Sequence, residues 1–167
     1  MSEPFVAVLM GSDSDLPVME STFDVLRSLD VPFEARITSA HRTPAQTQAY
    51  VADAEARGCR VFIAAAGMAA HLAGAVAAHT VRPVIGVPMN ASLDGLDALL
   101  STVQMPAGIP VASVAIGKAG AKNAAYLAAQ MIATGDPALH GKLREERDAN
   151  AAGVVAKNEA LQEQLKG

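Results

Sequence analysis

Short apolar segments alternate with helical patterns along most of this chain, and that alternation restricts the fold more than any other feature. Four of the segments are nearly continuous runs of apolar residues and one is weaker; they lie at 5–10, 33–39, 61–66, 83–89 and 111–116. Strands that are apolar on both faces are typical of a parallel sheet with helices covering both sides. The chain is therefore predicted to be an α/β protein.

Helical patterns occupy the intervals between these segments and are predicted at about 16–29, 43–58, 69–79, 92–104 and 119–133. The second begins with Thr43-Pro44-Ala45-Gln46, which matches a capping box with proline in the first helical position. The fourth carries four apolar residues on one face: Leu93, Leu96, Leu100 and Val103. Five strand–helix units predict a three-layer, flavodoxin-like doubly wound fold with a central five-stranded parallel sheet in the order 2-1-3-4-5.

The C-terminal segment differs from the rest because it is charged and has only a thin apolar stripe: Leu139, Leu143, Val154, Leu161 and Leu165. A single helix with so narrow a stripe gains little by packing on its own chain. We therefore expect a flavodoxin-like domain over 1–137 and a helical tail over 138–167 that packs on neighbouring subunits. A partly frayed surface helix is the alternative.

The amino-acid composition restricts the kinds of partner that the chain can bind and the cellular compartment expected for it. Charged residues make up 18% of the 167 residues, below the usual quarter, which favours an oligomer whose subunits cover part of the surface. The net charge of −4 and the lack of a basic cluster in the body argue against nucleic acid. Cys59 is the single cysteine, so no internal disulfide is possible. Neither a signal peptide nor a membrane span is expected, which together predicts a cytoplasmic protein.

Ligands of doubly wound sheets bind at the carboxyl ends of the strands, which directs attention to the turns there. The first turn reads Gly11-Ser12-Asp13-Ser14-Asp15. The hydroxyls of Ser12 and Ser14, with the backbone N–H groups of the following helix, suit a phosphate. Asp15 can accept hydrogen bonds from ribose hydroxyls. The alternative is that Ser14 or Asp15 is only the N-cap of that helix.

The second and third turns add groups that can bind and transfer protons. Arg42 can hold a phosphate through its planar set of donors, and His41 can move a proton near neutral pH. The alternative for His41 is a surface or capping role. Small residues after Gly67 would let a flat ligand approach, and His71 could hydrogen-bond that ligand or the backbone. No Cys/His spacing indicates zinc. The third strand ends without an acceptor Asp, which argues against a receiver domain.

Taken together, five motifs resemble the class I N5-carboxyaminoimidazole ribonucleotide mutases, the catalytic subunit of bacterial phosphoribosylaminoimidazole carboxylase. They are GSDSD at 11–15, SAHRTP at 39–44, AAHL at 69–72, VQMPAGIPVASVAIG at 103–117 and AGAKNAAYLAAQM at 119–131. The resemblance extends from about residue 5 to residue 134. The related class II carboxylases, which use free carbon dioxide, have Lys-Gly-Pro in place of Arg42-Thr43-Pro44, so the sequence favours the mutase.

The resemblance implies a reaction of purine biosynthesis on the route to IMP. N5-carboxyaminoimidazole ribonucleotide would become 4-carboxy-5-aminoimidazole ribonucleotide without ATP, metal or other cofactor. His41 would be the general acid and base. The implied substrate-binding residues are Ser12, Ser14, Asp15, Ser39, Ala40, Arg42, Gly67, His71 and Leu72. The family also implies a homo-octamer whose sites form where subunits meet.

Two positions depart from the family pattern in the third turn. Met68 stands where the family usually has a second glycine, and Ala73 stands where it has proline. A non-glycine residue adopts a positive φ only at a cost, and methionine adds bulk near the carboxylate pocket. A nucleotide-binding homologue without catalysis, with Met68 blocking the site, is therefore an alternative, as is a class II-type carboxylase that uses aminoimidazole ribonucleotide and carbon dioxide.

Overall fold

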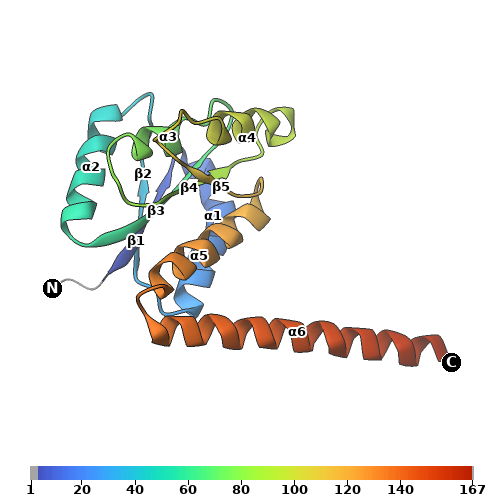
Figure 1. Ribbon diagram of the computed structural model, residues 1–167. Coiled ribbons are helices and arrows are strands. Elements are labelled where there is room, and N and C mark those ends of the chain that lie inside the picture. Colours follow the sequence, from blue (N-terminus) through green and yellow to red (C-terminus); the bar gives the residue numbers. More distant parts are fainter. Residues whose placement is uncertain (1–3, 167) are drawn as a thin grey trace.

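The computed structural model describes residues 4–166, in which a five-stranded parallel sheet lies between two layers of helices (Figure 1). The strand order is β2-β1-β3-β4-β5, and all four neighbouring pairs are parallel. The strands are β1 (Phe5–Met10), β2 (Phe33–Ile37), β3 (Cys59–Ala66), β4 (Val84–Pro88) and β5 (Ala112–Ser113). The predicted fold class and strand order are confirmed.

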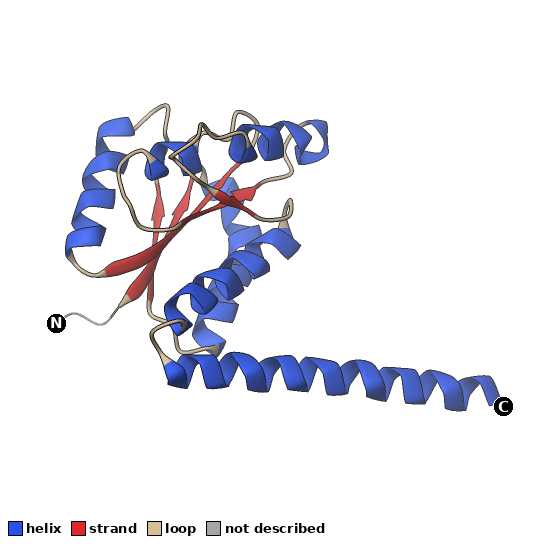
Figure 2. Ribbon diagram, viewed as in Figure 1, coloured by secondary structure: helices blue, strands red, loops and turns tan. Residues whose placement is uncertain are grey.

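Six α-helices and two short 3-10 helices are present within the described residues, and Figure 2 shows helices on both sides of the sheet. The α-helices are α1 (Leu16–Ser28), α2 (Pro44–Ala56), α3 (Leu72–Ala77), α4 (Leu96–Val103), α5 (Lys118–Ala133) and α6 (Pro137–Lys166). The 3-10 helices are η1 (Asp13–Asp15) and η2 (Leu93–Gly95). This arrangement leaves the carboxyl ends of the strands bordered by turns rather than covered by helices.

Strand β1 shows how a continuous apolar run supplies two cores. Val6 and Val8 are buried in the cluster that includes residues of α1 and α5. Ala7 and Leu9 alternate with them and belong to the opposite cluster, which includes residues of α2 and α3. Because successive side chains of a strand point to opposite faces, a strand buried on both faces needs apolar residues at every position. That requirement accounts for the pattern from which the sheet was predicted.

Several predicted elements are shorter than expected. The helix expected at 92–104 is α4, Leu96–Val103, because residues 93–95 form the separate helix η2 and Gly95 takes a left-handed conformation before α4. The helix expected at 69–79 is α3, Leu72–Ala77, because the preceding chain forms two tight turns instead. In these turns the Ala70 N–H donates to the Met68 carbonyl at 2.9 Å and the His71 N–H donates to the Ala69 carbonyl at 2.8 Å. The strand expected at 111–116 is β5, only two residues long. Its apolar pattern indicated the position correctly, but regular strand structure ends at Ser113, and beyond it the Val114 N–H donates to the Gly86 carbonyl at 3.1 Å.

Helix α4 presents its apolar stripe to solvent. The residues predicted to share one face are all exposed: Leu93, Leu96, Leu100 and Val103. Only the last three belong to α4; Leu93 lies in η2 with a φ of +43°, so the prediction of one helix face is wrong for it. Ala98 and Thr102 are the side chains that this helix buries. A Cβ atom at Gly86 of β4 would lie only 2.3 Å from Thr102 Cγ2, so the missing side chain allows α4 to approach the sheet along its small face.

Helix α6 contacts the body only through its first turns and then extends away from it (Figure 1). Leu139 and Leu143 are buried, whereas Val154, Leu161 and Leu165 are exposed. Its 30 residues correspond to a length of about 45 Å. No helix within residues 4–166 is both long and apolar enough to cross a membrane.

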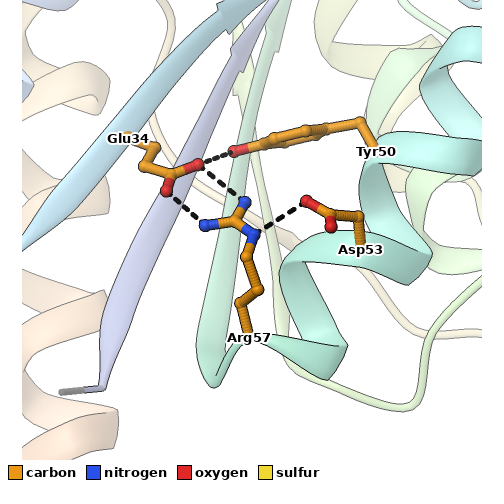
Figure 3. A network of polar contacts seen from close by, with 4 residues as sticks. All are labelled: Glu34, Tyr50, Asp53 and Arg57. Carbon is orange, nitrogen blue, oxygen red and sulfur yellow. Dashed lines mark hydrogen bonds and ion pairs between the residues drawn. The ribbon is translucent and has the colours of Figure 1, made fainter. Parts of the chain in front are cut away.

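A polar network joins the edge strand β2 to the C-terminal half of α2 (Figure 3). Glu34 accepts hydrogen bonds from both Nη atoms of Arg57 and from the Tyr50 hydroxyl. Arg57 Nε also donates to Asp53 at 2.8 Å. The Arg57 guanidinium lowers the pKa of the Glu34 carboxyl, and burial raises the pKa of Tyr50. These groups satisfy one another, which makes this cluster structural.

Candidate active site

The turns after β1, β2 and β3 border a cleft of about 470 Å³ at the carboxyl edge of the sheet. This volume is suitable for a small-molecule ligand. All ten residues proposed from the sequence line it: Ser12, Ser14, Asp15, Ser39, Ala40, His41, Arg42, Gly67, His71 and Leu72. Volume alone does not distinguish the cleft, because a hollow of about 430 Å³ between α5 and α6 is nearly as large. The cleft is distinguished by its chemistry, because it combines hydroxyls, a carboxyl, two imidazoles and a guanidinium.

The first turn is held by a reciprocal pair of hydrogen bonds between Ser12 and the residues that follow it. Ser12 Oγ accepts from the Ser14 N–H at 3.3 Å, and Asp15 Oδ2 accepts from the Ser12 N–H at 3.2 Å. Ser12 therefore caps η1 through its side chain. Asp15 does occupy the N-cap position of α1, as the alternative had it, but its side chain makes no cap hydrogen bond to that helix. Ser14 Oγ donates to Ser12 Oγ at 2.9 Å, so the two hydroxyls proposed for phosphate binding lie side by side.

Asp15 combines burial with a position on the cleft wall. Its side chain is only 8% exposed, and burial raises the pKa of its carboxyl. Backbone N–H groups of Ser12 and Gly11 oppose that shift by stabilising the ionised form. A carboxylate held in this way by short local bonds has a defined position, which suits an acceptor for ligand hydroxyls.

The second turn positions His41 and Arg42 through Ser39. Ser39 Oγ accepts from the backbone N–H groups of His41 at 3.3 Å and Arg42 at 3.1 Å. Thr43 Oγ1 accepts from the Ser39 N–H at 2.9 Å. The predicted capping box at Thr43 is therefore wrong, since its hydroxyl makes no cap hydrogen bond to α2 and closes the preceding loop instead. Pro44 does occupy the start of the helix, as predicted.

Arg42 connects the first two turns across the cleft. Its Nη2 atom donates to the Gly11 carbonyl at 3.4 Å, a long hydrogen bond between segments 31 residues apart. The side chain is exposed, and a guanidinium carries five N–H donors in a planar arrangement. Arg42 can therefore keep this contact and still bind an anion that enters the cleft.

The two histidines of the cleft contact each other directly. His41 Nε2 lies 2.8 Å from His71 Nδ1, and the two rings are nearly perpendicular at 83°. In a neutral pair only one of the facing nitrogens carries a hydrogen. When His41 is protonated, its Nε2 hydrogen can be accepted by His71. The sequence placed both residues in the site, but it carried no signal that they would pair.

The third turn is constrained on both sides of Met68. A Cβ atom at Gly67 would lie 3.0 Å from the Cβ of Ala91, so glycine allows the turns after β3 and β4 to pack closely. Met68 has a φ of +53°, in the left-handed region, and its side chain is 59% exposed. Leu72 borders the cleft, but its side chain is 2% exposed and belongs to the core.

Five further residues line the cleft that were not proposed as site residues: Gly11, Ala66, Met68, Ala69 and Ala91. The glycine and alanine residues among them carry no functional group, so they gave no chemical signal in the sequence. Met68 was recognised only as a departure from the family pattern. Among residues 4–166 there is no cluster of three or more His, Cys, Asp or Glu side chains suited to a metal ion.

Comparisons with known proteins agree over nearly the whole chain. The family model described as AIR carboxylase matches residues 5–153. The N5-carboxyaminoimidazole ribonucleotide mutase of Mycobacterium tuberculosis is 52% identical over 160 residues, covering 95% of this chain and 91% of that protein. The mutase of Bacillus subtilis is 48% identical over 160 residues, covering 95% of this chain and 99% of its own. The crystal structure of Treponema denticola PurE aligns with a TM-score of 0.86 at 30% identity, covering 95% of this chain and 99% of that one.

Proposed function

This chain belongs to the AIR carboxylase family, and on that basis we propose that it is an N5-carboxyaminoimidazole ribonucleotide mutase of purine biosynthesis. The reaction moves a carboxylate from the exocyclic nitrogen of the substrate to carbon C4 of the imidazole ring. The structural observation that carries the assignment is His41 beside Arg42 in a cleft that also presents Ser12, Ser14 and Asp15. As a step in nucleotide synthesis, the reaction is expected to take place in the cytoplasm.

We assign each part of the substrate to residues of the turns that border the cleft. The phosphate is assigned to Arg42 and to the paired hydroxyls of Ser12 and Ser14, which are hydrogen-bond donors beside a fixed cation. The ribose hydroxyls are assigned to Asp15, which can only accept when ionised. This leaves the imidazole ring next to the histidine pair. Ser39 and Ala40 shape the turn that carries His41, and Gly67 and Leu72 hold the opposite wall.

The proton balance of the reaction requires one group that acts in both directions. Cleavage of the bond between nitrogen and the carboxylate carbon releases carbon dioxide, and the nitrogen takes a proton from protonated His41. Carbon C4 then attacks the carbon dioxide, and neutral His41 removes the proton that C4 carried. A histidine suits this cycle because its two protonation states are close in energy near neutral pH. His71 Nδ1 lies 2.8 Å from His41 Nε2 and can fix the orientation of that ring through a hydrogen bond.

Carbon dioxide must remain in the site between the two steps, since its escape ends the reaction. Exclusion of water and retention of both fragments would supply much of the rate through proximity. The class II-type reaction, which takes up free carbon dioxide, is the second candidate. Arg42-Thr43-Pro44 after His41 disfavours it. The non-catalytic alternative depends on whether Met68 blocks the ring position.

The experiment that tests the proposal uses N5-carboxyaminoimidazole ribonucleotide with purified protein and neither ATP nor added bicarbonate. We expect rapid appearance of the C4-carboxylated isomer, followed by its absorbance. Formation only from aminoimidazole ribonucleotide and bicarbonate would support the class II reaction instead. Tight binding of the nucleotide without conversion would identify a non-catalytic homologue.

We also propose that the working form is a homo-oligomer, an octamer by resemblance to the family. The exposed apolar residues of η2 and α4 (Leu93, Leu96, Leu100 and Val103) and those of α6 are not covered by residues 4–166 of the same chain. A second copy of this chain is the occupant that would cover both. Replacement of Leu100 by Glu should lower the assembly size in analytical ultracentrifugation while the circular dichroism spectrum is preserved. An unchanged assembly would remove α4 from the interface.

A further inference from the structure

Met68 is the apolar residue of the cleft whose backbone conformation is unfavourable for its type. Four non-glycine residues within 4–166 have a positive φ: Asp30, Met68, Leu93 and Asp94. Aspartate visits this region more readily because its short polar side chain can hydrogen-bond locally, which methionine cannot do. Leu93 does not line the cleft. Met68 is therefore a strained position inside the candidate active site.

The strain persists because the chain is fixed on both sides of Met68. Gly67 packs against Ala91 so closely that a Cβ atom there would lie 3.0 Å from the alanine methyl. Ala70 is 1% exposed, and its N–H donates to the Met68 carbonyl at 2.9 Å. A residue at position 68 therefore has to take the left-handed conformation, where glycine would be easiest.

Packing within the single chain does not explain a methionine at this position. Its side chain is 59% exposed, so it gains little from burial. It lines the same cleft as His41 and His71, where the imidazole ring of the substrate is assigned. Methionine is flexible and polarisable, and its thioether makes favourable contacts with aromatic rings.

We propose that Met68 is a specificity-determining residue that packs its thioether side chain on the heterocycle of the bound nucleotide and excludes water from the ring. This inference rests on the proposed function for the identity of the ring. The contact would favour nucleotides with the imidazole over sugar phosphates without it. It would also reduce the escape of carbon dioxide during the reaction.

Three substitutions at this position separate the side chain from the backbone. Met68→Ala removes the side chain and keeps a strained backbone. Met68→Gly removes both the side chain and the strain. Met68→Leu keeps the strain and an apolar side chain of similar volume. Asp30→Gly is the matched control, since it relieves a left-handed residue (φ of +54°) that does not line the cleft.

The primary measurement is calorimetric affinity for two probes, aminoimidazole ribonucleotide and ribose 5-phosphate, which lacks the ring. Met68→Ala and Met68→Gly should each weaken binding of the nucleotide by about fivefold and leave ribose 5-phosphate unchanged. Met68→Leu should stay within about twofold of the wild type, and Asp30→Gly should match it. Equal nucleotide affinity in the wild type and Met68→Ala overturns the proposal. So does an equal loss for both probes.

A second measurement follows the fate of N5-carboxyaminoimidazole ribonucleotide after correction for its spontaneous decarboxylation. In Met68→Ala, the ratio of free aminoimidazole ribonucleotide to C4-carboxylated product should rise about fivefold over the wild type. An unchanged ratio would contradict retention by Met68. Failure of the wild type to form the product would overturn the proposed function, and the affinity comparison would still decide the role of Met68. If the wild type binds neither probe, both proposals fail.

Discussion

Two clusters of polar side chains lie on this sheet, and they differ in how their hydrogen bonds are used. In the cluster of Glu34, Tyr50, Asp53 and Arg57, each side chain bonds to another member (Figure 3). In the cleft, His41 and Arg42 are exposed, and their side chains contact only His71 and the Gly11 carbonyl among the bonds found within residues 4–166. In the first cluster each charged side chain has a partner within the cluster. In the cleft the Arg42 guanidinium and the His41 imidazole remain accessible to a ligand.

The comparison shows that polar residues in a pattern do not by themselves indicate function. Glu34 and Arg57 are as rich in charge as His41 and Arg42, but their mutual bonds tie β2 to α2. A group whose bonding capacity is already satisfied gains little from binding a ligand, while an open group gains more. If this distinction is right, substitutions in the cleft should change activity, and substitutions in the network should change stability alone.

The largest expected effect comes from His41→Asn. Removal of the general acid and base should lower the rate of C4 carboxylation by about 10²- to 10⁴-fold. Affinity for the nucleotide should change little, because the phosphate and ribose contacts remain. Stopped-flow kinetics and calorimetry measure the two quantities separately. Turnover close to that of the wild type would show that His41 is not the acid and base.

Arg42→Ala should affect binding more than chemistry. Loss of charged hydrogen bonds to the phosphate of about 1.5–3 kcal/mol corresponds to an affinity about 10- to 100-fold lower. The loss should be smaller at high salt, where wild-type binding itself is screened. Titration of the nucleotide at two ionic strengths tests this. Unchanged affinity would remove Arg42 from the phosphate site.

Glu34→Gln should lower the free energy of unfolding at neutral pH by about 0.5–1 kcal/mol, a modest value because the side chains of Glu34 and Arg57 are 34% and 38% exposed. The pKa of Glu34 is lowered in the folded chain, so its contribution is present above the ordinary carboxyl pKa and is lost as pH falls through the folded value. Denaturation from pH 7 to pH 3 should show the two proteins converging in acid. Mutase activity should be unaffected, and reduced turnover would contradict the structural role of the network.

Asp15→Asn should change the free energy of unfolding least, and its effect should have the opposite sign to that of Glu34→Gln. Burial raises the pKa of Asp15, so the ionised carboxylate destabilises the folded chain above that pKa, and stability increases as pH falls through it. Asparagine can still accept from the Ser12 N–H, so a slight stabilisation is expected at pH 7. Nucleotide affinity should fall at the same time because the amide is a weaker acceptor. Thermal denaturation at pH 7 that shows clear destabilisation would contradict this account.

The residues proposed from the sequence line one cleft because the fold brings the strand ends together in a fixed way. Once five parallel strands in the order 2-1-3-4-5 are assigned, the turns with Ser12, His41 and His71 must share one edge. The hydrogen bonds made by side chains within the turns were harder to predict from the sequence. Thr43 matched a capping box, but its hydroxyl bonds back to Ser39, because a short polar side chain can bond to the backbone on either side.

The sequence by itself determined the class of fold, the order of the strands and the residue types at the cleft. These follow from periodicity and from turn positions, which are local properties of a chain. Only the tertiary structure decided that the stripe of α4 faces outward, that His41 contacts His71 and that Met68 is held at a positive φ. Each depends on contacts between distant segments. Gly86 leaves space for Thr102 of α4, the turns that carry His41 and His71 meet across the cleft, and Ala91 packs against Gly67 beside Met68. Periodicity identifies the residues that share a face, but the packing of the whole domain decides where that face points.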